Sequence, residues 1–132
     1  MTADLYHAVN AAINAATPAI ARICGEVWEL AELSLEEVAS ANVHMRELEA
    51  AGFTITSRGT SGQATAFIAE WEQGTAGPRI GFLPEYDALP GIGHACGHKN
   101  AGLPTFGRTE LALKMKAAAE MVPLVRLERT LR

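Results

Sequence analysis

Hydrophobic residues in the first fifty positions recur at helical spacing and predict two helices. From residue 4 to about residue 33, an alanine-rich stretch places its aliphatic side chains near one helical face. Pro18 predicts a break or restart there, because proline lacks an amide hydrogen and crowds the preceding turn. A second helix is predicted from the capping box Ser34-Leu35-Glu36-Glu37 to Gly52.

The same spacing predicts which helical side chains are buried. One face of the second helix carries Leu35, Val38, Asn42, Met45 and Leu48, and we expect it to pack against the first helix. His44 is a lone histidine on a predicted helix and is expected to face solvent. A solvated face is predicted for the glutamates at 26, 29, 32, 36 and 37.

After Gly52 the hydrophobic period shortens to two, which is typical of half-buried strands. Strands are predicted over residues 53–57, 63–71 and 79–83, and glycine-containing turns separate them. A last helix is predicted over residues 108–121, ending before Pro123. This order predicts the α/β class, with two or three helices packed on a sheet of about three strands.

Composition narrows the class of protein without identifying it. The chain has 132 residues, of which 48% are hydrophobic, so it can bury a modest core. Two cysteines are too few for a disulfide scaffold, and no apolar run approaches the roughly 18 residues that span a bilayer. A net charge of −4 disfavours a nucleic-acid partner. We therefore expect a cytoplasmic protein with neither a nucleic-acid nor a membrane partner.

The charge changes sign along the chain. Residues 1–98 carry four basic and twelve acidic side chains, whereas residues 99–132 carry seven basic and three acidic ones. This shift predicts two segments, 1–98 and a divergent, basic, helical tail over 99–132. The alternative is a basic last helix that lies over an acidic body.

The candidate chemistry is concentrated in one segment. Five potential metal ligands lie close together after the third predicted strand: Glu85, Asp87, His94, Cys96 and His98. The last three alternate, so an extended backbone would project them to one side, and imidazole with thiolate suits zinc. A catalytic thiol is the alternative, because a neighbouring histidine would lower the pKa of Cys96.

The run EYDALPGIGHACGH, together with the upstream VWELAELSLEE and LEAAGFTI, resembles the aminoacylase and carboxypeptidase-G-like metallopeptidases. The resemblance is to the branch of aminobenzoyl-glutamate utilisation and β-alanyl-dipeptide hydrolases. It implies a helix-flanked sheet catalytic domain, of which residues 1–98 form the N-terminal part. It also implies amide hydrolysis in small N-acyl amino acids or dipeptides, with one or two zinc or manganese ions. A sheet without its later strands would have an open edge, which favours self-association, so a homo-oligomer is one option.

The resemblance implies roles for individual residues. Cys96 and His98 match the paired metal ligands, and Asp87 matches the catalytic acidic residue behind the metal. Glu85 and His94 are expected to line the site. The family's general-base glutamate and distal histidines have no counterparts here, so we expect a truncated chain that is inactive alone. The rival hypothesis is a small non-enzymatic domain that binds metal or a partner.

Overall fold

The computed structural model describes residues 2–72, 81 and 85–95. It contains helix α1 (Thr2–Leu30), helix α2 (Val38–Ala50), strand β1 (Thr54–Arg58), a 3₁₀ turn (Thr60–Gly62) and strand β2 (Phe67–Glu70). Within these ranges no helix combines the length and apolar character needed to cross a membrane. The two helices and the sheet confirm the predicted α/β class. The predicted third strand and last helix lie outside the described residues, apart from Gly81.

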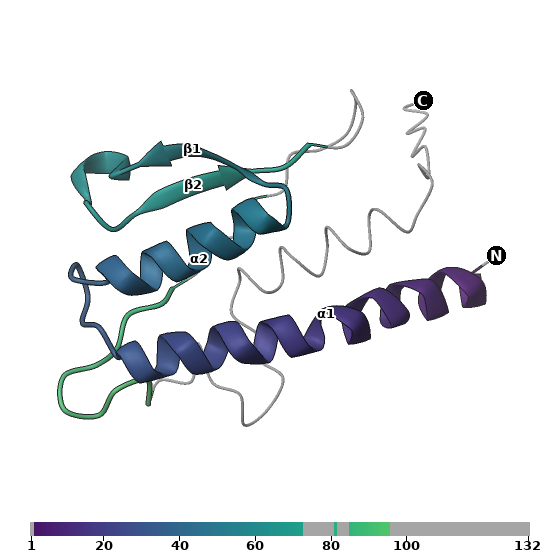
Figure 1. The fold of residues 1–132 in the computed structure, drawn as a ribbon, viewed down its shortest axis with the longest axis horizontal. Helices are drawn as coiled ribbons and strands as arrows, with labels where there is room; N and C mark the ends of the chain where they lie inside the picture. The colour runs from purple at the N-terminus through teal and green to yellow at the C-terminus, as the bar shows by residue number, and fades with distance from the viewer. Residues whose placement is uncertain (1, 73–80, 82–84, 96–132) are drawn as a thin grey trace, which may run out of the picture.

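The described elements form three layers, with α2 in the middle (Figure 1). The two helices run antiparallel, and the β1–β2 hairpin covers the side of α2 opposite α1. Ile23 and Val27 of α1 meet Val43 of α2 in the most buried cluster. Met45 and Leu48 are buried as predicted. Apolar burial of this kind is the main force that holds the helices together.

The hairpin follows the alternation of its sequence. β1 pairs antiparallel with β2, with Thr54 opposite Glu70 and a register shift between Ile55 and Ser57. Along β1 half-buried residues alternate with exposed ones, and β2 repeats this pattern. At the turn Gly59 has a φ of 70°, a left-handed conformation that glycine adopts without steric cost. The sheet therefore presents one face to α2 and the other to solvent.

Helix α1 passes through Pro18 without interruption, so the predicted break was wrong. A proline inside a helix costs about 3 kcal/mol through its missing hydrogen bond and its ring. Ile20, Ile23 and Val27 follow it and are at most 1% exposed. Each fully buried aliphatic side chain contributes about 1.5–3 kcal/mol, so this face outweighs the proline.

The predicted capping box is also absent, because α2 begins at Val38 rather than after Ser34. Residues 33–36 form a turn in which the Glu36 amide donates to the Leu33 carbonyl at 3.0 Å. The carboxylate of Glu32 takes over the capping role and accepts hydrogen bonds from the amides of Ala39 at 3.0 Å and Ser40 at 2.7 Å. These two amides belong to the first turn of α2, whose N–H groups have no partner within the helix.

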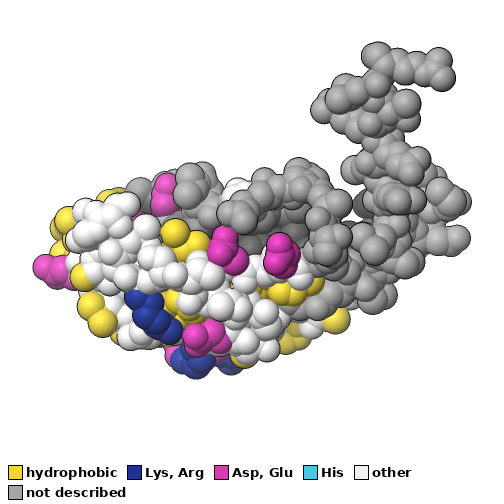
Figure 2. Space-filling model, turned by 90° about the horizontal axis from the view of Figure 1, so that it is seen from above, with side chains coloured by type: hydrophobic (Ala, Val, Ile, Leu, Met, Phe, Trp, Pro, Cys, Tyr) yellow, Lys and Arg dark blue, Asp and Glu magenta, His cyan; other side chains and the backbone are white. Residues whose placement is uncertain are grey.

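The later helix start changes which side chains are buried. Leu35 lies in the turn and is 65% exposed, and Val38 is 60% exposed, so neither belongs to the buried face as predicted. His44 is 5% exposed and Glu37 is 8% exposed, although both were expected to face solvent. In the view of Figure 2, no histidine surface shows among the described residues on that face. His44 of α2, and Glu37 just before it, are therefore covered by another segment of the chain.

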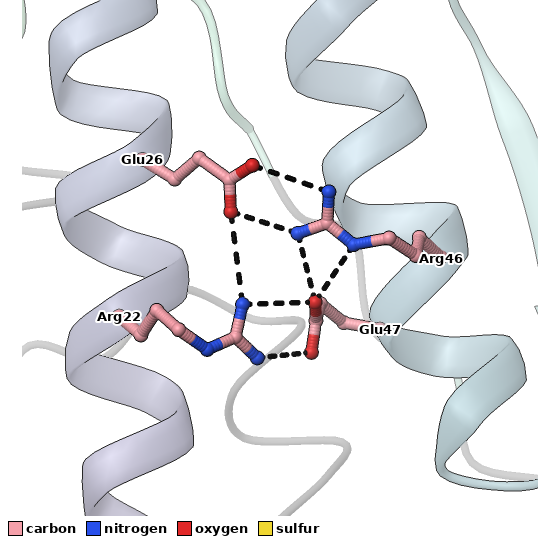
Figure 3. Close-up of polar contacts among 4 residues, drawn as sticks. All are labelled: Arg22, Glu26, Arg46 and Glu47. Carbon is pink, nitrogen blue, oxygen red and sulfur yellow. Dashed lines mark hydrogen bonds and ion pairs between the residues drawn. The ribbon is translucent and has the colours of Figure 1, made fainter.

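Four charged side chains join the two helices on their exposed side (Figure 3). Arg22 of α1 contacts both carboxylate oxygens of Glu47 of α2, at 3.1 and 2.6 Å. Arg46 of α2 contacts both oxygens of Glu26 of α1, at 3.1 and 2.7 Å, and also reaches Glu47 at 2.8 Å. These arginines lower the pKa of each glutamate, chiefly through the hydrogen bonds. The network therefore links α1 to α2 through charged side chains on their exposed side.

Candidate functional site

Residues 85–95, here called the 85–95 loop, lead into the predicted metal-ligand motif. The loop reverses direction at Pro90 and Gly91, where the φ of Gly91 is 74°. Proline followed by a glycine of positive φ fits a type II turn. Leu89 and Gly93 close this turn with two main-chain hydrogen bonds of 2.8 and 3.0 Å. Gly93 itself has a φ of 58°, so glycine is favoured at both positions.

The loop is attached to the segment that follows α1. The Ala88 amide donates to the Glu32 carbonyl at 2.7 Å, and Ala88 forms a parallel bridge with Leu33. Ala88 is 2% exposed, so its methyl group belongs to the core. In Figure 1 the loop lies beside the C-terminal end of α1. Glu32 thus supports two elements at once, because its carbonyl holds the loop while its carboxylate caps α2.

Tyr86 attaches the 85–95 loop to α2 and to the β1–β2 hairpin. Its hydroxyl donates to the Thr65 carbonyl at 2.7 Å, and its ring lies 5.1 Å from the His44 ring and 6.2 Å from the Phe67 ring. Burial, and then the negative charge of Glu37, raise the pKa of Tyr86 to about 12. Tyr86 is therefore a neutral hydrogen-bond donor at physiological pH.

Tyr86 also explains how polar side chains come to be buried at α2. It covers His44, while the Glu37 carboxylate accepts a hydrogen bond from the Thr65 hydroxyl at 2.8 Å. Buried polar groups are tolerated when they find such partners. The sequence analysis missed Tyr86. The available signal was an aromatic residue between two acidic ones in a loop expected to be polar.

His94 is buried at the junction of the loop with α1. It is 4% exposed, and its ring centroid lies 5.8 Å from that of Trp28. Nδ1 lies 3.2 Å from the Asp87 carbonyl oxygen, and Nε2 lies 3.0 Å from the Val27 carbonyl oxygen. Whichever ring nitrogen carries the proton, a carbonyl is placed to accept it. His94 is predicted to line the site, and in the structure each of its ring nitrogens faces a main-chain carbonyl.

The other predicted site residues are only partly described. Asp87 is half-buried, with its carbonyl directed to His94, and Glu85 is exposed. Cys96 and His98 lie outside the described residues. Within the described ranges, no three His, Cys, Asp or Glu side chains come together as a metal-binding set. By donor chemistry alone, the thiolate and imidazole of the motif fit zinc. The metal ligands thus stay a prediction.

Comparison with known proteins identifies the class. No protein-family model matches the chain. It is 34% identical over 120 residues to one of the subunits of the Escherichia coli p-aminobenzoyl-glutamate hydrolase, a match that covers 78% of this chain and 24% of that protein. It is 40% identical over 96 residues to the human Xaa-Arg dipeptidase, covering 65% and 22% of the two chains. For the mouse Xaa-Arg dipeptidase the identity is 35% over 119 residues, covering 83% and 26%.

These relatives are named as a subunit of a p-aminobenzoyl-glutamate hydrolase and as dipeptidases. The chain belongs to their branch of the aminoacylase and carboxypeptidase-G-like superfamily, which confirms the resemblance carried by the ligand motif. It spans about a quarter of the length of these relatives.

Proposed function

We propose that this chain supplies the N-terminal, metal-binding part of a metal-dependent hydrolase that cleaves amide bonds in small N-acyl amino acids or dipeptides. The observation that carries the proposal is the motif EYDALPGIGHACGH in a chain 34–40% identical to named hydrolases of this kind. The described geometry supports it, because residues 85–95 of this motif are held in place by the Ala88 amide, which donates to the Glu32 carbonyl, and by the His94 ring, which contacts the Val27 carbonyl.

In this proposal Cys96 and His98 hold a zinc or manganese ion, and Asp87 stands behind them as the acidic residue that orients the ligands. A divalent ion there supplies Lewis-acid chemistry, which polarises the amide carbonyl and lowers the pKa of a bound water. The described residues contribute rigidity. Asp87 is flanked by Tyr86, which bonds to Thr65, and by Ala88, which bonds to Glu32.

The substrate class follows the names of the relatives. An aminobenzoyl-glutamate and an Xaa-Arg dipeptide both carry an amide bond to the nitrogen of an amino acid with a free α-carboxylate. We propose the same class for the hydrolase to which this chain contributes. The choice between an acidic and a basic leaving amino acid depends on contacts outside the described residues.

Cobalt substitution tests both the site and the substrate class. Co²⁺ bound to Cys96 should give a thiolate charge-transfer band, which Cys96→Ser removes. Cys24→Ser is the matched control, because Cys24 lies half-buried on α1, outside the ligand motif. Aminobenzoyl-glutamate or an Xaa-Arg dipeptide should then shift the visible cobalt spectrum, whereas free aminobenzoate plus glutamate should not. A band that survives Cys96→Ser would contradict the metal site.

A further inference from the structure

His94 connects two parts of the chain that are far apart in sequence. Its Nε2 lies 3.0 Å from the carbonyl oxygen of Val27, 67 positions earlier, and its Nδ1 lies 3.2 Å from the carbonyl oxygen of Asp87 in its own loop. The ring nitrogen that carries the proton donates to the carbonyl it faces. The ring is buried beside Trp28, so water does not compete for these contacts.

The contact with Val27 uses a group that the end of a helix leaves available. Val27 lies in the last turn of α1, whose final carbonyls have incomplete partners within the helix. Its oxygen already accepts the Ala31 amide at 3.3 Å, and its second lone pair faces His94. The contact between His94 and Val27 therefore attaches the loop to the C-terminal end of α1.

The contact with Asp87 closes the loop across its turn. His94 and Asp87 lie seven positions apart, on either side of the hydrogen-bonded pair Leu89 and Gly93. The ring thus holds the backbone of Asp87 close to the point where the chain continues toward Cys96 and His98. A shift of this ring would move Asp87 relative to that point.

We propose that His94 is a positioning residue that locks the 85–95 loop on α1 and fixes Asp87 relative to the start of the ligand motif. This inference rests on the proposed function, because the positioned residues are those assigned to the metal site. His94 itself contacts neither metal nor substrate in the proposal; it acts through the backbone of Asp87.

Two conservative variants separate the two contacts. An asparagine amide reaches the position of Nδ1, so His94→Asn can keep the bond to Asp87 and loses the bond to Val27. A glutamine amide reaches the position of Nε2, so His94→Gln can keep the bond to Val27 and loses the bond to Asp87. His94→Ala loses both. Leu48→Ala is the control for stability, since Leu48 is buried on α2 and makes no hydrogen bond to the loop.

Zinc affinity and amide hydrogen exchange are measured on the full 132-residue chain, with the free energy of unfolding measured in parallel. His94→Ala should weaken zinc binding on the order of tenfold, the loss expected when a residue that orients metal ligands is removed. His94→Asn should recover more of the affinity than His94→Gln, because it keeps the bond to Asp87. The amides of Ala88, Leu89 and Gly93 should lose protection in His94→Ala and keep it in Leu48→Ala.

The outcomes separate this inference from the proposed function. Equal zinc affinity in wild type and His94→Ala overturns the positioning role and leaves the metal site intact. The positioning role is also overturned if zinc affinity only follows the free energy of unfolding, so that Leu48→Ala binds zinc as weakly as His94→Ala. If the wild type binds no zinc, the proposed function fails. The exchange data then decide the inference: lost protection in His94→Ala supports it, and retained protection overturns it.

Discussion

Ala31 ends α1 in a conformation that is costly for its side chain. Its φ is 44°, in the left-handed region where a Cβ atom crowds the following carbonyl at a cost of about 1–2 kcal/mol. Glycine is the residue that most often occupies this position after a helix. The chain leaves α1 here and turns toward Glu32, which caps α2 and holds the 85–95 loop.

Replacing Ala31 with glycine should therefore stabilise the protein. We expect Ala31→Gly to raise the free energy of unfolding by about 1 kcal/mol, because the strain at positive φ disappears. Ala21→Gly, at an exposed position inside α1, should instead lower it by about 1 kcal/mol. Urea unfolding of both variants measures the two changes. A decrease in Ala31→Gly would show that the left-handed conformation is not adopted.

The burial of a single residue could be predicted from the sequence only where the residues that cover it belong to a neighbouring element of the chain. Met45 and Leu48 were predicted correctly, because their partners follow from the pairing of two adjacent helices. His44 and Glu37 were not, because Tyr86 and Thr65 cover them from distant positions. Helical spacing alone cannot distinguish a polar residue in solvent from one under a loop.

At the scale of elements, α2 depends on a carboxylate that precedes it by several positions. Glu32 accepts hydrogen bonds from two amides of the first turn, and capping bonds of this kind contribute about 0.5–2 kcal/mol. Glu32→Gln should lower the free energy of unfolding by about 1 kcal/mol, because the charge that favours both bonds is lost. Glu29→Gln, at an exposed position on α1, should leave it nearly unchanged. Thermal unfolding followed by circular dichroism compares the pair; equal midpoints would exclude the cap.

The ion-pair network between α1 and α2 predicts loss of stability in acid. The pKa of Glu26 is lowered by its hydrogen bonds to Arg46, and that of Glu47 chiefly by those to Arg22. A lowered pKa means that the folded state binds protons less readily than the unfolded state. The contribution is therefore complete above the ordinary carboxyl pKa of 4.5 and disappears as the pH falls below it.

Denaturant unfolding at about pH 7 and about pH 3, on either side of the ordinary carboxyl pKa, measures this effect. Arg46→Gln should reduce the difference in stability between the two pH values, because it removes the group that lowers the pKa of Glu26. Arg58→Gln is the control, since Arg58 pairs with Glu49 outside the network. An unchanged pH difference in Arg46→Gln would contradict a stabilising role for the network.

Over the whole molecule, the order of elements could be predicted and several boundaries could not. Two helices followed by a hairpin were visible in the change from helical to alternating spacing. The continuity of α1 through Pro18 could not be predicted, because it depends on the buried face that follows the proline. The start of α2 at Val38 could not be predicted either, because it depends on the hydrogen bond from the Ser40 amide to the Glu32 carboxylate. Local propensity is a weak signal when packing opposes it.

For the candidate site, too, one part could be predicted from the sequence and another could not. The ligand motif and its family were identifiable from sequence, because the residue types and their spacing are themselves the signal. The position of the loop was not, because it depends on contacts such as that between Val27 and His94, 67 positions apart. The spacing of residues within one segment cannot predict a contact with another segment so far away in the sequence.

Tyr86 connects the loop to α2 and the sheet, so its removal tests how the whole molecule is joined. Tyr86→Phe should lower the free energy of unfolding by about 1 kcal/mol, since the Thr65 carbonyl loses its donor. Because the pKa of Tyr86 is raised to about 12, this stabilisation is complete below pH 10 and falls as the pH rises toward 12. Tyrosinate absorbance should show a component near pH 12 in wild type that Tyr86→Phe lacks. Its persistence in the variant would contradict the buried hydroxyl.

In the proposed function, the segment beyond the 85–95 loop binds a divalent metal through Cys96. Zinc content after exhaustive dialysis, measured in wild type, Cys96→Ser and Cys24→Ser, tests it most directly. We expect stoichiometric zinc in wild type and in Cys24→Ser, and its loss in Cys96→Ser. Zinc retained in full by Cys96→Ser, or absent from the wild type, would contradict it.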